Sequence, residues 1–305
     1  MICVKFVKKN VYFPDLVDHW FRNHSLEITA GSALNYRSKV RYLKEKFPIN
    51  AKKITVFMLQ DMVIELIEKN YTPNTLWVYR KILRMIFAFG CKYYYLPENP
   101  VESVVFPKPT SAEHEPFCAD EIEKILLAET KDWIRDAIII ALKTGMRKGE
   151  IFALKWTDIN FEKRAIYIGR TQAPDLNGGV ILKKPKTKYS ERTIFVDSKL
   201  IDHLYKLKEL SKSEYIFSMP DGSNRDPHNM SAEFRNVCEK AGVKPRSFHT
   251  LRHTHTTILL ESGISDTAIV DRLGWGSTAM LQTYGHVTPK MRVEVEKLFY
   301  DFPGL

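Results

Sequence analysis

Two arginines and a histidine in the second half of the chain could together bind a phosphodiester and move a proton beside it. Arg147 follows a Thr-Gly-Met sequence, and Arg252 lies three residues after His249. A guanidinium offers planar, bidentate donors to phosphate oxygens and stays charged at physiological pH. Residues three apart share one face of a helix, and an imidazole titrates near neutrality. These residues indicate phosphoryl-transfer chemistry, although a structural role remains open for either arginine alone.

The histidines of this segment leave a second chemistry open. His249, His253 and His255 lie close together in the sequence, and the first two have the i, i+4 spacing of zinc ligands. No HExxH glutamate and no nearby cysteine pair accompany them. We therefore expect no metal, and we expect structural or backbone-bonding roles for His253 and His255.

A run of cations lies between a predicted strand and the next one. Its members are Lys183, Lys184, Lys186, Lys188 and Arg192. A solvated hairpin is the usual meaning of such a run. Alternatively, the hairpin enters a DNA groove and supplies a lysine as general acid, because neighbouring cations lower a lysine pKa.

Four segments resemble the tyrosine recombinase, or phage integrase, family in the family's order. They are TGMRKGEI at 144–151, KPKTK at 184–188 with RTI at 192–194, FHTLRHT at 248–254, and LGWGS at 273–277 leading to LQTYGHV at 281–287. One such segment is a modest signal, whereas four in order are specific. The likeness is strong over about residues 119–290 and weaker over 12–110.

The resemblance implies that Tyr284 is the nucleophile, attacking DNA to give a 3′-phosphotyrosyl link and a free 5′-hydroxyl. A phenol has a pKa near 10, so it needs cationic neighbours or a base to react at neutral pH. Arg147, Arg252 and His249 would supply them. Because the covalent link retains the phosphodiester energy, we expect no ATP, no cofactor and no metal.

The resemblance also favours Lys186 as the general acid, with Lys184 and Lys188 as close competitors. Glu150 lies three residues after Arg147, and we expect it to orient the arginine or the histidine.

Trp275 departs from the commonest family pattern, in which histidine follows Leu-Gly. An indole N–H donates one hydrogen bond but cannot exchange a proton as imidazole does. We therefore expect phosphate binding and packing at this position, with a plain core tryptophan as the alternative.

Composition agrees with a polyanionic partner without identifying it. The 305 residues carry a net charge of +10, which favours encounter with nucleic acid. Four cysteines lie far apart, which is typical of reduced thiols. No run of 18 apolar residues and no secretion signal occur, so we expect a cytoplasmic, nucleoid-associated protein and no membrane partner.

The pattern predicts a mainly α protein with a small antiparallel β-sheet (α+β). We expect a helical core-type DNA-binding domain at 1–102, a proline-rich linker at 103–116, a catalytic domain at 117–288 and a tail helix for subunit contact at 289–305. Residues 165–169, 180–184 and 192–196 are β-branched runs that predict one sheet. Helices are expected at 119–129, 133–143, 198–210, 229–241, 249–262, 266–273 and 278–284.

The first domain shows clear helix signals. Tyr36, Val40, Leu43 and Phe47 follow the spacing of one helical face. Caps are expected at Thr55, with Met58, Met62 and Leu66 inward, and at Thr72 before a proline. Fewer than a dozen residues precede the first expected helix, so we expect no arm-site DNA-binding domain there.

By resemblance, the partners are double-stranded DNA attachment sites and further copies of the chain, four of which would exchange strands through a Holliday junction to integrate or excise a phage or other mobile element. Accessory directionality or DNA-bending proteins would be further partners. The alternatives are a chromosome-dimer resolving recombinase, a type IB topoisomerase, and a non-cutting helix-turn-helix regulator built on 266–273 and 278–284.

Overall fold

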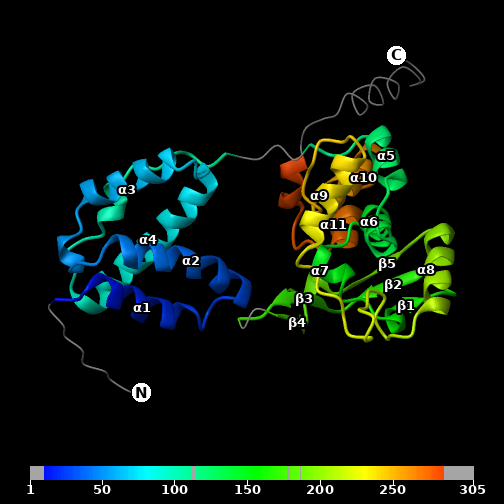
Figure 1. Cartoon of the computed structure of the whole chain (residues 1–305), viewed down its shortest axis with the longest axis horizontal. Helices are drawn as coiled ribbons and strands as arrows, with labels where there is room; N and C mark the ends of the chain where they lie inside the picture. The colour runs from blue at the N-terminus through cyan, green and yellow to red at the C-terminus, as the bar shows by residue number, and fades with distance from the viewer. Residues whose placement is uncertain (1–9, 111–114, 177–178, 186, 285–305) are drawn as a thin grey trace, which may run out of the picture. The chain divides into compact units, whose positions relative to one another are not determined.

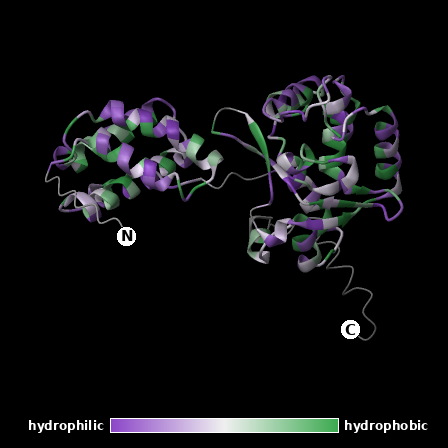
Figure 2. Ribbon diagram, turned by 90° about the horizontal axis from the view of Figure 1, so that it is seen from below, coloured by the Kyte–Doolittle hydropathy of each residue, from purple (hydrophilic) through white to green (hydrophobic). Residues whose placement is uncertain are grey.

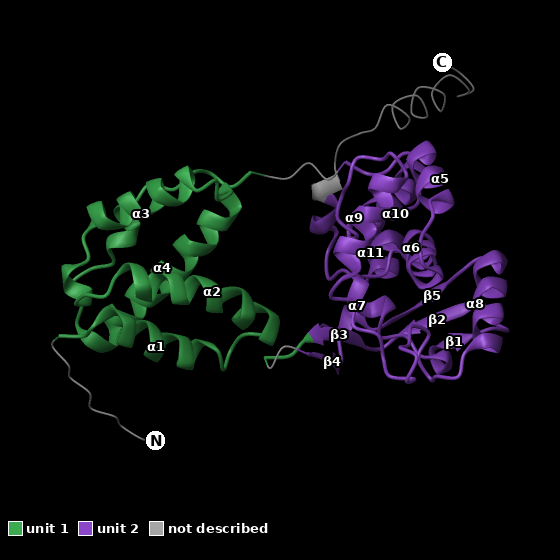
Figure 3. Cartoon of the chain, in the orientation of Figure 1, with its two compact units in different colours: residues 1–113, 174–178 green, residues 114–173, 179–305 purple. Residues whose placement is uncertain are grey.

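The computed structural model describes residues 10–110, 115–176, 179–185 and 187–284 (Figure 1). The chain divides into two compact units (Figure 3). Unit 1 comprises residues 1–113 with 174–178, and unit 2 comprises 114–173 with 179–305.

The described part of unit 1 is helical. Its elements are α1 (Phe13–His24), α2 (Ala30–Lys46), α3 (Val56–Glu68) and α4 (Pro73–Tyr94), with short 3-10 turns at Ala51–Lys53 and Pro100–Ser103. The predicted caps are confirmed: the hydroxyl of Thr55 accepts from the Met58 amide, and that of Thr72 from the Thr75 amide. Each cap satisfies a backbone donor that the first helical turn leaves without a partner.

The core of unit 1 follows the predicted helix faces. Tyr36, Val40, Leu43 and Phe47 are all buried. On α3 the buried face includes Leu59 and Val63 beside the predicted Met62 and Leu66, whereas Met58 is only partly buried at its edge. Figure 2 shows hydrophobic and hydrophilic residues following one another in short stretches along these helices, as expected where one helix face is buried.

The start of the predicted linker is packed on unit 1. Val104 is buried in its core, and the backbone of Val105 exchanges two hydrogen bonds with the Gln60 amide group. The indole of Trp77 donates to the Pro107 carbonyl over 2.6 Å. Residues 104, 105 and 107 of the predicted linker therefore contact unit 1.

Unit 2 combines helices with short strands. Its described elements are α5 (Ala119–Leu127), α6 (Asp132–Thr144), α7 (Lys148–Ile151), β1 (Ile159–Asn160), β2 (Ala165–Ile168), β3 (Thr171–Pro174), β4 (Val180–Lys183), β5 (Arg192–Phe195), α8 (Ser198–Leu210), α9 (Met230–Lys240), α10 (Thr250–Glu261) and α11 (Asp266–Leu273), with 3-10 turns at Trp156–Asp158, Lys188–Ser190 and Thr278–Tyr284. The mainly helical fold with antiparallel β-structure is confirmed.

The strands form two sheets where one was predicted. β1, β2 and β5 make an antiparallel sheet in which Ile166 faces Ile194 across the pair, while β4 pairs with β3 in a separate two-stranded sheet. Inward residues alternate along β5 but not along β4, whose residues are mostly exposed. The basic run between β4 and β5 therefore joins two sheets, and the predicted basic hairpin is wrong.

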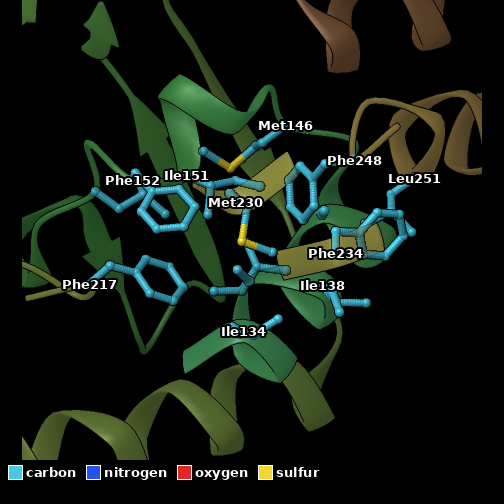
Figure 4. Close-up of a cluster of buried hydrophobic side chains, with 14 of the residues drawn as sticks. Ile134, Ile138, Met146, Ile151, Phe152, Phe217, Met230, Phe234, Phe248 and Leu251 are labelled. Atoms are coloured by element: carbon cyan, nitrogen blue, oxygen red, sulfur yellow. The ribbon is translucent and has the colours of Figure 1, made fainter. Parts of the chain in front are cut away.

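The core of unit 2 lies directly behind the predicted chemistry. Phe234 packs edge-to-face on Phe248, with 5.5 Å between ring centroids, and Met146 belongs to the same cluster (Figure 4). Met146 and Phe248 immediately precede Arg147 and His249. Close packing behind both segments limits how far they can shift.

The end of the described chain differs from the prediction. Residues Thr278–Tyr284 form a 3-10 helix, so they do not provide the second α-helix that a helix-turn-helix regulator requires. The tail helix predicted at 289–305 lies outside the described residues. Among those described, no helix is both long and apolar enough to cross a membrane.

Candidate active site

Gly145 brings the segment before Arg147 against two other helices. It ends α6 with a φ of 66° in the left-handed region. A Cβ at this position would lie 2.5 Å from His255 Cδ2 on α10 and 2.7 Å from Leu273 Cδ2 on α11. Glycine is therefore needed both for the backbone angle and for the close approach.

Arg252 joins three of the four motif segments. This side chain of α10 is 2% exposed. One guanidinium nitrogen donates to the Gly145 carbonyl over 2.6 Å, another donates to the Leu273 carbonyl over 2.7 Å, and the guanidinium lies 5.4 Å from the ring centre of Trp275. These contacts hold the charge in one orientation and attach it to the segments that carry Arg147 and Trp275.

Glu150 contacts Arg147, one of the two residues that it was expected to orient. The buried carboxylate accepts from the Arg147 guanidinium over 2.8 Å and from the Arg147 backbone amide over 2.9 Å. Burial alone would raise the pKa of Glu150, but the charges and hydrogen bonds of Arg192 and Arg147 outweigh burial and lower it. The carboxylate is therefore ionised at neutral pH, while the Arg147 side chain remains 38% exposed.

Arg192 belongs to this network, although it was predicted to lie in a basic hairpin, either solvated or entering a DNA groove. Its side chain is 4% exposed and donates to both oxygens of Glu150, over 3.3 and 3.1 Å, and to the Arg272 carbonyl over 2.7 Å. The signal was present in the strand pattern, because Arg192 lies two residues before Ile194 and so shares its inward face. Arg192 attaches the second motif segment to the first and the fourth.

Arg272 and His255 tie the same helices together. The Arg272 guanidinium donates to His255 Nε2 over 3.1 Å and to the carbonyls of Phe195 and Lys143 over 3.0 Å each, and His255 Nδ1 donates to the Leu142 carbonyl over 2.7 Å. Burial, followed by the charge of Arg272, lowers the pKa of His255 to about 4. His255 is therefore a neutral structural residue, as predicted.

The zinc alternative finds no geometric support. Both ring nitrogens of His255 are engaged in the hydrogen bonds above. The rings of His249 and His253 meet edge-to-face with 4.8 Å between centroids. In the part of the chain that the structure describes, no group of three potential ligands could hold a metal ion.

His249 lies at the start of α10, one helical turn before Arg252. His249 and Arg252 therefore lie close together at the start of one helix, as predicted. Trp275 is 6% exposed and packs in a small cluster with Ile269, Leu273 and Leu281. Its packing role is confirmed, whereas phosphate contact by its indole stays a prediction.

Two predicted residues cannot be placed in the site. Lys186 lies outside the described residues, and its competitors Lys184 and Lys188 are exposed on either side of it. The backbone of Tyr284 ends the last 3-10 helix, but its side chain lies outside the described part of the structure. Their roles as general acid and nucleophile stay predictions.

The network as a whole carries an excess of positive charge. Arg147 and Arg192 bond the Glu150 carboxylate, whereas Arg252 and Arg272 donate to backbone carbonyls of the adjoining segments, and His255 is neutral. Fixed cations of this kind stabilise the charge that grows on phosphate oxygens during nucleophilic attack. The arrangement therefore suits phosphoryl transfer.

Comparison with known proteins decides the family. The model of the phage integrase family matches residues 117–291, more than half of the chain. The chain belongs to the phage integrase family. A XerC-like tyrosine recombinase of Caldanaerobacter subterraneus subsp. tengcongensis is 27% identical and covers 96% of this chain and 84% of its own length. The ICEBs1 integrase of Bacillus subtilis is 25% identical over 94% and 82%.

Solved structures share the fold of this family member. The integrase of transposon Tn1549, bound to transposon right end DNA, superposes with a TM-score of 0.80 at 20% identity and covers 94% of this chain and 99% of its own. A lambda integrase in a tetramer bound to a Holliday junction gives a TM-score of 0.73 at 22% identity, over 91% and 78%. Family membership makes the chain a site-specific DNA recombinase of the integrase type.

Proposed function

We propose that this integrase cuts and rejoins DNA by forming a covalent 3′-phosphotyrosyl link on Tyr284. One observation supports the proposal most strongly. Arg252 bonds the carbonyls of Gly145 and Leu273, and the Glu150–Arg192 ion pair joins the other motif segment, so all four segments meet in one cationic network. A protein that only binds DNA has no need of such a network.

The arginines bind the scissile phosphate in this proposal. Arg147, whose side chain is partly exposed and oriented by Glu150, donates to nonbridging oxygens together with Arg252. His249 moves a proton at the attacking or leaving oxygen, and the indole N–H of Trp275 supplies a further donor. Because these groups are fixed before the reaction, they stabilise the transition state without reorganising.

The reaction proceeds in two matched transfers. The phenolic oxygen of Tyr284 passes its proton to His249 and attacks phosphorus. The bond from phosphorus to the 5′ oxygen breaks, and the leaving oxygen takes a proton from a lysine ammonium, which we assign to Lys186. A 5′-hydroxyl of the partner strand then attacks the phosphotyrosine and regenerates the phenol. The number of phosphodiester bonds is conserved, so the exchange needs no ATP.

The partners follow from the relatives. The lambda integrase structure contains a tetramer on a Holliday junction, and the Tn1549 integrase was solved with transposon end and circular intermediate DNA. We infer that this chain binds attachment sites in duplex DNA and assembles four copies there, with residues 289–305 reaching a neighbouring subunit. Accessory directionality or DNA-bending proteins would choose between integration and excision.

The substrate is most simply a mobile element, since relatives include the ICEBs1 integrase and the integrase of Staphylococcus phage L54a. The XerC-like relative supports a chromosome-dimer resolvase as the second candidate. Sequencing the DNA around the gene distinguishes them. Direct repeats that bound an inserted element favour the integrase. A chromosomal dimer-resolution site, with no such repeats around the gene, favours the resolvase.

The polarity of cleavage tests the proposed chemistry. Duplexes carrying the element's end sequence and a nick beside the cut site would be labelled on one strand end at a time, and covalent complexes would be resolved on denaturing gels. We expect the protein to be bonded to the 3′ phosphate at one end of the cut and a free 5′-hydroxyl at the other end. Protein attached to a 5′ phosphate, or cleavage without a covalent complex, contradicts the proposal. A plasmid without attachment sites is the control, because its efficient relaxation would indicate a topoisomerase.

A further inference from the structure

Residues 115–121 are the first described residues of unit 2, and Arg246 bonds two of their carboxylates. One nitrogen of the Arg246 guanidinium donates to Glu121 over 2.9 Å, another donates to Glu115 over 3.1 Å, and the guanidinium carbon lies 4.6 Å from the ring centre of Phe117. The side chain of Arg246 is only 12% exposed, whereas that of Glu115 is 64% exposed. The inner pair with Glu121 is therefore the stronger attachment.

The same segment is hydrogen-bonded to the catalytic helix. The backbone amide of Phe117 donates over 3.0 Å to the hydroxyl of Thr254, which itself donates to the Thr250 carbonyl over 2.9 Å. Thr254 is 1% exposed and lies on α10, two residues after Arg252. A buried amide without this acceptor would be costly, so the contact fixes Phe117 on α10.

Aromatic packing gives a second route to the same helix. Phe117 packs edge-to-face on Phe234, with 5.9 Å between centroids, and Phe234 packs in the same way on Phe248. Figure 4 shows the Phe234 and Phe248 rings together in the core. Phe248 directly precedes His249. A displacement of Phe117 would therefore reach the start of α10 through close-packed rings.

We propose that Arg246 and Thr254 are positioning residues that fix the segment 115–121 on the start of α10 and so set the positions of His249 and Arg252. The chain from unit 1 continues directly into this segment, so a displacement of the segment would be transmitted to His249 and Arg252 through Phe117. Its consequence for cleavage rests on the proposed function. Misplacing a catalytic group by about 1 Å can slow a reaction roughly a hundredfold, so a small loosening is sufficient for a large effect.

The loop before α10 offers a matched control. Lys244 lies two residues before Arg246, and its ammonium is 3.9 Å from Glu115, but its side chain is 78% exposed. Lys244→Met removes a charge from the same loop without touching Phe117. Arg246→Met removes both carboxylate attachments, and Arg246→Lys keeps the charge but not the two-armed geometry. Glu121→Gln removes the inner ion pair at nearly constant shape.

The experiment measures hydrogen exchange and cleavage on the full chain. In Arg246→Met we expect peptides covering 247–256 to exchange about tenfold faster, and the cleavage rate at saturating DNA to fall by about tenfold or more, with DNA affinity within about twofold of wild type. Arg246→Lys should restore part of both effects, and Lys244→Met should change neither. If Arg246→Met does not fold, Glu121→Gln is read in the same way.

Unchanged exchange at 247–256 overturns the inference. A loss of affinity equal to the loss of rate also overturns it, because that result would make Arg246 a DNA contact. If wild type forms no adduct at Tyr284, the proposed function fails, and the exchange measurement still decides whether Arg246 fixes α10.

Discussion

Replacing Arg192 by leucine should mainly lower stability, whereas replacing Arg147 by leucine should mainly lower the cleavage rate. Both arginines bond Glu150, but the Arg192 and Glu150 side chains are each 4% exposed, whereas that of Arg147 is 38% exposed. Arg192→Leu leaves a buried carboxylate with one partner and removes the donor to the Arg272 and Ser190 carbonyls. Removing one side of a buried ion pair costs about 3–5 kcal/mol. The Arg147 side chain is partly exposed and Arg192 would still pair with the carboxylate, so removing Arg147 should cost less, about 1–2 kcal/mol.

The predicted signature is a crossed pattern. Arg192→Leu should lower the free energy of unfolding of unit 2 by about 3–5 kcal/mol, which leaves a folded protein if unit 2 has the usual 5–15 kcal/mol. Arg147→Leu should lower it by only about 1–2 kcal/mol and yet reduce cleavage by about a hundredfold or more, because it removes a phosphate donor. Stability would then depend mainly on Arg192 and the cleavage rate mainly on Arg147, although both residues bond Glu150.

Urea titration with native-state hydrogen exchange measures this, because exchange in peptides of α7, β5 and α11 reports on unit 2 without interference from unit 1. Single-turnover covalent-complex formation gives the cleavage rate. Equal stability of the two variants would refute the argument. It would mean that the buried contact of Arg192 with Glu150 contributes no more than the partly exposed contact of Arg147 with Glu150. Full activity in Arg147→Leu would refute its assigned role.

Three further predictions follow from particular contacts. The folded pKa of His255, about 4, lies below its ordinary 6.5, so its stabilisation is present above pH 6.5 and is lost as pH falls towards 4. Wild type should lose about 2 kcal/mol between pH 6.5 and 4.5 that His255→Gln does not lose, as measured by urea titration at each pH. A Cβ at Gly145 would lie 2.5 Å from His255, whereas Gly222 has a similar positive φ with nothing within 4 Å; Gly145→Ala should therefore lower the unfolding free energy by about 1–3 kcal/mol more than Gly222→Ala, and equal losses would show that backbone strain alone matters. Because arginines neutralise the phosphate in the proposed mechanism, strand cleavage should continue at an undiminished rate in EDTA; activity that disappears and returns with a divalent cation would contradict this.

Local signals in the sequence predicted much of this structure. The caps at Thr55 and Thr72 depend on neighbouring residues, and they lie where the pattern placed them. The contact between Arg147 and Glu150 spans three residues and was predicted for the same reason.

Non-local pairing was not predictable in the same way. The runs 180–184 and 192–196 look alike in the sequence, but β4 pairs with β3 while β5 pairs with β2. Arg192 was therefore predicted in a basic hairpin, whereas the structure has it in a buried ion pair. Arg252 was predicted to face phosphate, and its attachment to the Gly145 and Leu273 carbonyls depends on segments 107 and 21 residues away, which no local pattern specifies.

The central claim concerns one phenolic oxygen, and peptide mapping of the trapped protein–DNA complex tests it most directly. After nuclease and protease digestion, mass spectrometry should find a nucleotide on Tyr284 in wild type, while Tyr284→Phe should bind the same DNA and yield no modified peptide. A nucleotide on any other side chain, or an adduct that persists in Tyr284→Phe, would contradict the account.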